Sequence, residues 1–252
     1  MVSYGYDVSN SVYSPEGKLY QLEYAKKQVD NEHGVIIGVC CTDGVVLMAE
    51  KLVDSPLYEN DSLSQLFKVD KNLAMMFTGI WADGLKLANL ANKEALKNKE
   101  DYGFQMDTNE LCKKVAFEMY SHTLSGAVRS YGCELLVGSC SSSPQLYKVS
   151  LDGSIEKYVA TAVGKGFEIA LSSLETLNFT CSCEEIIPHI GKIILQVHND
   201  TFKDRNFTFE IGIVNNSNWY FIYITILDGL KIKSEGEVEQ ILSQSNELLN
   251  EM

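Results

Sequence analysis

The chain has 252 residues, of which 45% are hydrophobic, and a formal net charge of −13 at pH 7. A chain of this length and apolar content can bury one large core, and its apolar runs are shorter than the ~20 residues of a membrane-spanning helix. An acidic chain without a Lys/Arg cluster does not favour nucleic-acid binding. We therefore expect a single domain over residues 1–252, with neither a nucleic acid nor a membrane as partner.

The cysteines and the start of the chain indicate a reducing compartment. Seven cysteines are present, an odd number, and no CxxC pair occurs among them. Residues 1–30 lack the basic start and the apolar run of a secretory signal. The HExxH metal motif and the GxSxG nucleophile elbow are missing as well, so motif search finds no active site. We expect no metal site and no cofactor.

The N-terminal stretch GYDVSNSVYSPEGKLYQLEYAKKQV combines aromatic and polar residues. Its segment Ser14-Pro15-Glu16-Gly17 fits a type I turn, with proline in the second position and glycine in the fourth. Leu19, Leu22, Ala25 and Val29 then recur at helical spacing. The pattern predicts a turn followed by an amphipathic helix.

Three turn motifs divide the apolar runs that follow into pairs. Thr42-Asp43-Gly44, Asp70-Lys71-Asn72 and Asp152-Gly153 each separate two such runs, which is typical of β-hairpins. A last pair, FTFEIGIV and WYFIYITI, follows towards the C-terminus. The pattern of turns and apolar runs therefore predicts strands that pair with their neighbours in sequence.

Helices are predicted between the strand pairs. One carries a seam of small residues, and the next starts at Asp107 with Glu110 as its capping-box partner. Two more are expected at about 167–177 and 184–199, and a polar helix from about Glu235 leads into a short acidic tail. The seam of small residues comprises Ala88, Ala91 and Ala95. The helix that starts at Asp107 has an apolar face that comprises Leu111, Val115 and Met119.

The order of these elements predicts the fold class. Strand pairs alternate with helix pairs, which argues against a doubly wound parallel sheet. It favours an α+β fold in the form of a four-layer αββα sandwich, with two stacked antiparallel sheets flanked by helices and an extra N-terminal helix.

The opening segment strongly resembles the N-terminal segment of proteasome alpha subunits, with a Tyr-Asp pair, a Ser-Pro-acid-Gly turn and a Gln-x-Glu-Tyr-Ala helix. The resemblance continues through DGVVLMAEK, TGIWADG, AVRSYG and GKG and covers about residues 4–235. The stretches EKLVDSPLYE, LFKVD and TFEIGIV look most like the type-3 branch of the family, which holds the seventh position of the eukaryotic alpha ring.

The resemblance implies a sandwich of the N-terminal nucleophile hydrolase type. It further implies a non-catalytic subunit in a seven-membered outer ring, with beta subunits below and regulatory particles or activators above. Such a subunit would build the ring, contribute to the substrate gate and dock activators during ubiquitin-dependent protein degradation. The compartments implied are the cytoplasm and the nucleus.

The catalytic residues of the related beta subunits are an N-terminal threonine, an acid and a lysine. By resemblance the threonine position falls at Gly34 and the lysine position at Gln65, so both roles are vacant, while Glu50 retains the acid. The alternative of an active threonine peptidase of the same fold is disfavoured by these two positions. A thiol enzyme acting through Cys181 or Cys183 is a further alternative, although free cysteines in apolar stretches more often serve as small hydrophobes.

The N-terminal residues acquire a role through the resemblance. Tyr6, Asp7, Pro15 and Tyr24 match residues that hold the pore gate open through contacts with a neighbouring subunit. A carboxylate that faces tyrosine hydroxyls makes charge-assisted hydrogen bonds, and proline fixes the turn that brings the groups together. These four residues are the predicted gate cluster.

A pocket between adjacent alpha subunits, which receives the C-terminal tails of activators, is also implied. Gln65 stands where the lysine of that pocket pairs with the tail carboxylate, so the ion pair is missing here. Ser130 replaces the proline common next to Arg129, and the tail NELLNEM is short. The predicted pocket residues are Leu19, His33, Gln65 and Gly79.

Overall fold

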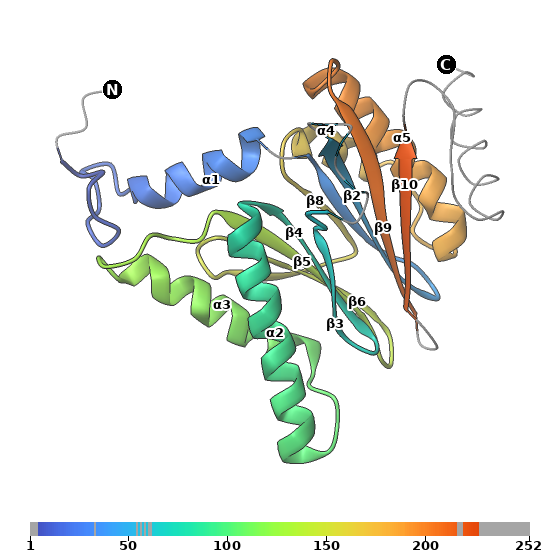
Figure 1. Ribbon diagram of the computed structural model, residues 1–252, viewed down its shortest axis with the longest axis horizontal. Helices are drawn as coiled ribbons and strands as arrows, with labels where there is room; N and C mark the ends of the chain where they lie inside the picture. Colours follow the sequence, from blue (N-terminus) through green and yellow to red (C-terminus); the bar gives the residue numbers. More distant parts are fainter. Residues whose placement is uncertain are drawn as a thin grey trace.

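The computed structural model describes residues 5–32, 34–53, 55, 57, 59, 62–215 and 219–226. In this part of the chain ten strands form two five-stranded sheets, ordered β10-β9-β2-β1-β8 and β3-β4-β5-β6-β7, and all neighbouring strands are antiparallel (Figure 1). The strands are β1 (Ile36–Cys40), β2 (Gly44–Val53), β3 (Leu66–Asp70), β4 (Leu73–Gly79), β5 (Cys133–Cys140), β6 (Pro144–Val149), β7 (Ile155–Tyr158), β8 (Ala160–Val163), β9 (Asn206–Asn215) and β10 (Trp219–Ile226).

Two helix pairs cover the outer faces of the stacked sheets. The helices α2 and α3 pack on the sheet that contains β4 and β5, while α4 and α5 pack on the sheet that contains β1 and β2 (Figure 1). The remaining helix, α1, lies apart from both pairs and contacts β4 and β5. The helices are α1 (Tyr20–Glu32), α2 (Trp81–Tyr102), α3 (Thr108–Leu124), α4 (Phe167–Leu174) and α5 (Cys183–Thr201). The predicted four-layer sandwich with an extra N-terminal helix is confirmed.

Alternation along the strands divides the buried side chains among three layers of core. In β2, Val45 and Leu47 face the other sheet, whereas Val46 and Met48 face the helices, because successive side chains of a strand point to opposite faces. The sheets approach closely at glycines: a Cβ on Gly38 would lie 2.8 Å from a methyl carbon of Leu146. The strands therefore carry apolar residues on both faces.

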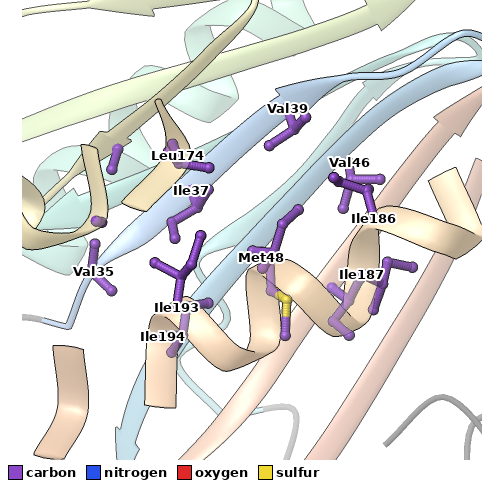
Figure 2. Packing of buried hydrophobic residues seen from close by; sticks show 14 of the residues in the cluster. Val35, Ile37, Val39, Val46, Met48, Leu174, Ile186, Ile187, Ile193 and Ile194 are labelled. Atoms are coloured by element: carbon purple, nitrogen blue, oxygen red, sulfur yellow. The ribbon is translucent and has the colours of Figure 1, made fainter. Parts of the chain in front are cut away.

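The helix side of the first sheet holds the isoleucine-rich core. Figure 2 shows Ile37 and Met48 on the strands facing Ile187 and Ile193 on α5, and all four side chains are at most 5% exposed. The helix begins at a capping box, for which the S-x-x-E spacing of Ser182 and Glu185 is a sequence signal that the predicted start at about residue 184 did not use. Ser182 accepts a hydrogen bond from the Glu185 N–H, and the Glu185 carboxylate accepts one from the Ser182 N–H.

The local predictions differ from the structure in small ways. The helix expected at 167–177 ends at Leu174. Asp107 caps α3 by accepting a hydrogen bond from the Asn109 N–H at 3.1 Å, while Glu110 pairs with Lys113 at 2.5 Å, so a single cap replaces the predicted capping box. The predicted helix from Glu235 and the acidic tail lie outside the described residues. No helix in the described part of the chain combines the length and apolarity needed to cross a membrane.

Candidate functional site

The position matched to the nucleophile lies where the chain enters β1, and it has no room for a side chain. The Thr78 hydroxyl donates to the Gly34 carbonyl at 3.1 Å, and the Glu50 N–H donates to the Val35 carbonyl at 2.9 Å. A Cβ on Gly34 would lie 2.0 Å from the Glu50 carbonyl oxygen. Real Cβ atoms do not approach a backbone oxygen that closely, so this geometry excludes a threonine at residue 34 without a shift of the backbone.

The retained acid, Glu50, is buried and fully engaged. Its side chain is 0% exposed. One carboxylate oxygen accepts a hydrogen bond from the Val35 N–H at 3.1 Å, and the other lies 2.5 Å from Nδ1 of His198 on α5. The His198 ring packs against Phe207, with centroids 4.2 Å apart. Glu50 therefore ties the first sheet to α5 and has no free oxygen to offer a substrate.

The residue pattern had not singled out His198, although a signal was present. His198 follows Ile190 and Ile194 at intervals of four residues, which places it on the buried stripe of α5. A histidine on such a stripe needs a buried partner, and Glu50 is that partner.

Gln65, matched to the missing lysine, lies beside a second buried carboxylate. Its backbone N–H donates to Glu210 at 2.8 Å, and Glu210 is 0% exposed. The Ser64 hydroxyl donates a hydrogen bond to the other oxygen of the same carboxylate. The side-chain oxygen of Gln65 is buried and has no hydrogen-bond partner among the described residues. Among the described residues this oxygen is therefore a buried acceptor without a donor.

The predicted pocket residues fall into two places. The Gln65 carbonyl accepts a hydrogen bond from the Phe77 N–H at 3.1 Å, so Gln65 lies next to the strand that ends at Gly79. Leu19 directly precedes α1, which contains 13 residues and therefore runs for about 20 Å before the chain reaches β1. His33 lies outside the described residues.

Of the predicted gate residues, Pro15 lies in an ordered turn and Tyr24 lies on the helix that follows it. The Gly17 N–H donates to the Ser14 carbonyl at 2.8 Å, and Gly17 has a φ of 77°, which confirms the turn predicted around Pro15. Tyr24 on α1 is 43% exposed, and its ring stacks on Tyr20 with centroids 6.2 Å apart. The Asp7 carbonyl accepts a hydrogen bond from the Gln21 side chain.

The expected bonds of the gate cluster remain untested. Within residues 5–32, no hydrogen bond joins the Asp7 carboxylate to the hydroxyl of Tyr6 or Tyr24. The resemblance places those contacts on a neighbouring subunit, which a single chain does not contain. The pairing of these residues across subunits therefore stays a prediction.

The loop that contains the substituted proline position is held by an ion pair. Arg129 binds the Asp83 carboxylate through two hydrogen bonds of 2.5 and 2.8 Å, and the Gly132 N–H donates to Asp83 at 2.8 Å. Burial would raise the pKa of Asp83, but the hydrogen bonds from Arg129 and Gly132 outweigh it and hold the pKa below its usual range. The Ser130 hydroxyl is buried without a partner among the described residues.

The thiol alternative finds little support in the environment of its cysteines. Cys183 is 2% exposed, and the hydrogen bond with Cys41 together with burial raises the pKa of its thiol. Burial also raises the pKa of the Cys181 thiol. Because the thiolate is the nucleophile, a raised pKa lowers reactivity at neutral pH. Within the described part of the chain, no group of three or more His, Cys, Asp and Glu residues could hold a metal ion.

A stacked pair of antiparallel sheets between helix layers, with a closed nucleophile position and an added N-terminal helix, defines a class that comparison with known proteins identifies. The family model for proteasome subunits matches residues 31–214, and the N-terminal signature of alpha-type proteasome subunits matches residues 6–27. The chain belongs to the proteasome subunit family and is of the alpha type.

The curated relatives of this chain include alpha type-3 proteasome subunits. The chain is similar to the alpha type-3 proteasome subunit of Drosophila melanogaster, with 37% identity over 83% of each chain. It is 34% identical to the alpha type-3 subunit of Dictyostelium discoideum over 97% of this chain and 98% of that one. The proteasome alpha subunit of Methanosphaerula palustris is 34% identical over 84% of this chain and 88% of its own.

Proposed function

We propose that this chain is a non-catalytic subunit of the alpha ring of the proteasome core particle. The observation that carries the proposal is the closed position at Gly34, where a Cβ would lie 2.0 Å from the Glu50 carbonyl oxygen. A threonine peptidase of this fold needs a free N-terminal threonine there. In this chain α1 and the preceding turn occupy the sequence ahead of β1, which supports a structural role for the N-terminal segment.

The proposed partners follow from the same reading. This chain would occupy the seventh position of a seven-membered ring of alpha-type chains. Beta subunits would lie below this ring, and activators would dock above it. The exposed ring of Tyr24 and the exposed turn at Pro15 fit a surface that a neighbouring subunit covers and that contributes to the substrate gate. Cytoplasm and nucleus are the proposed compartments, which fractionation of cells that express the tagged chain would check.

The first expected result concerns covalent labelling. Complexes purified through a tag on this chain should have the native mass of a multi-subunit particle, and a threonine-directed inhibitor should label other chains of the particle but not this one. The reason is that residue 34 is a glycine without a hydroxyl. Intact-mass spectrometry of each chain after inhibitor treatment provides the measurement. An inhibitor adduct on this chain, or a native mass equal to that of the chain alone, contradicts the proposal.

The second expected result concerns activator docking at Gln65. In assembled rings, Gln65→Lys should tighten the binding of an activator tail peptide, because an ammonium forms a stronger, charge-assisted hydrogen bond with the tail carboxylate. A gain of about 1 kcal/mol corresponds to roughly fivefold in affinity, and high salt should remove it. Fluorescence anisotropy of a labelled tail peptide measures the change.

A matched control separates charge from size. Gln65→Met has nearly the same length without a polar group and should not tighten tail binding. Glu210 is the competing partner, because its carboxylate already accepts the Gln65 N–H at 2.8 Å. If Gln65→Lys leaves the affinity unchanged at low salt, the lysine faces Glu210 or solvent rather than the tail, and the proposed pocket is placed wrongly.

A further inference from the structure

One side chain joins the N-terminal segment to a helix more than a hundred residues away. The Asn10 amide nitrogen donates to the carbonyls of His122, Ser125 and Val128, at 3.2, 3.2 and 2.6 Å. Asn10 is only 9% exposed. The first of these carbonyls belongs to the last turn of α3, and the other two belong to the segment that follows it. Asn10 therefore spans the C-terminal end of a helix and the loop behind it.

The receiving carbonyls explain why an amide fits there. The last carbonyls of a helix have no partner within the helix, and Ser125, where α3 ends, is extended. A carboxamide presents two N–H donors and can share them among three carbonyls. Neither a carboxylate nor an apolar side chain of similar size could do so.

The rest of the N-terminal segment has little else to hold it in place. Val8 is 82% exposed and Val12 is 43% exposed. The hydroxyls of Ser9 and Ser11 bond to each other at 3.0 Å rather than to the body of the protein. A second amide, that of Gln21, holds the Asp7 carbonyl from α1. Apart from Tyr6, which is partly buried, polar anchors rather than apolar burial thus set the position of residues 5–13.

The platform under Asn10 is itself braced. Nδ1 of His122 lies within hydrogen-bond distance of the Arg129 carbonyl oxygen, at 3.1 Å. Arg129 in turn forms the ion pair with Asp83 on α2 through two hydrogen bonds. The loop that receives Asn10 is therefore tied to both α2 and α3.

We propose that Asn10 is the positioning residue that holds the N-terminal segment against the end of α3, and so sets the resting position from which the gate works. The role of Asn10 as an anchor of the N-terminal segment follows from its contacts alone, whereas the consequence for the gate rests on the proposed function. Residue 10 lies between Asp7 and Pro15 of the predicted gate cluster, so releasing it frees the segment between them.

The test uses the full chain with Asn10→Ala, Asn10→Asp and the matched control Ser9→Ala. We expect hydrogen exchange in residues 5–13 to become about tenfold faster in both Asn10 variants, while exchange in α3 stays unchanged. The aspartate is nearly isosteric but has no N–H donor and faces three carbonyls, so it should be at least as disruptive as alanine. Ser9→Ala removes only the two hydrogen bonds between the Ser9 hydroxyl and the hydroxyl and N–H of Ser11, so it should change exchange at the Ser11 amide alone and leave the rest of residues 5–13 unchanged.

The second measurement is peptide hydrolysis by assembled core particles that contain the same variants. Hydrolysis of a short fluorogenic peptide per particle should rise several-fold for the Asn10 variants with normal incorporation of the chain, whereas a purely structural defect would lower incorporation instead. Unchanged exchange in residues 5–13 of Asn10→Ala overturns the anchor, whatever the particles do. Faster exchange with unchanged peptide hydrolysis confirms the anchor and overturns the proposed contribution to the gate.

Discussion

Replacing Gly34 with threonine should destabilise the chain by at least about 3 kcal/mol and should not produce a peptidase. The added Cβ would meet the Glu50 carbonyl oxygen at 2.0 Å, and that backbone also carries the Glu50 N–H bond to Val35. Relief of the clash requires a shift of β1 or β2 in the middle of a packed sheet. Chemical denaturation measures the loss of stability, and a fluorogenic peptide assay tests for cleavage.

Two control variants make the result interpretable. Gly34→Ala should already cause most of the loss, because the clash arises at Cβ and not at the hydroxyl. Gly126→Thr should change the free energy of unfolding by less than about 1 kcal/mol, since a Cβ there meets nothing within 4 Å. A stable Gly34→Thr chain that cleaves peptide would show that the site lacks only its nucleophile, and the conclusion that the backbone closes position 34 to a side chain would fail.

Replacing His198 with alanine should lower the free energy of unfolding by about 3–5 kcal/mol, because removing one partner of a buried pair leaves the other uncompensated. Glu50 is 0% exposed and lies 2.5 Å from the His198 ring nitrogen. The substitution also removes the ring that packs on Phe207, which leaves a cavity. Denaturant titration of the isolated chain, followed by circular dichroism, provides the measurement.

The same helix offers a matched control. His189 lies on α5 as well but is exposed, so His189→Ala should change stability by less than about 0.5 kcal/mol. A third variant, Glu50→Gln, keeps the acceptor for the Val35 N–H while it removes the charge, and it should cost less than His198→Ala. If the two histidine variants prove equally stable, the Glu50–His198 pair does not hold the sheet to the helix.

Most of the regular elements could be predicted from the sequence because their signals are local. Leu111, Val115 and Met119 recur at helical spacing, and all three are 0% exposed. The turn at Thr42-Asp43-Gly44 joins β1 and β2 as expected. Errors occurred where two local solutions compete, as at Asp107, where a single cap with a neighbouring ion pair replaced the capping box.

The strand that follows Asp152-Gly153 shows where local signals end. The sequence reads as a continuous stretch, yet β7 pairs with β6 in one sheet and β8 pairs with β1 in the other. The exchange happens at Val159, whose carbonyl accepts a hydrogen bond from the Cys40 N–H at 2.7 Å. Hydrogen bonds to a strand more than a hundred residues earlier decide which sheet receives the chain.

The sequence by itself determined the family, the order of strands and helices, and the absence of a hydroxyl at Gly34 and of a charge at Gln65, since these depend on residue types and short spacings. Only the tertiary structure decided that Gly34 has no room for a side chain, that Glu50 is paired with His198, and that Asn10 reaches the end of α3. Glu50 and His198 are 148 residues apart in the chain, and Asn10 and Val128 are 118 apart. A buried polar group must find a partner, but the fold, and not the spacing along the chain, determines which one.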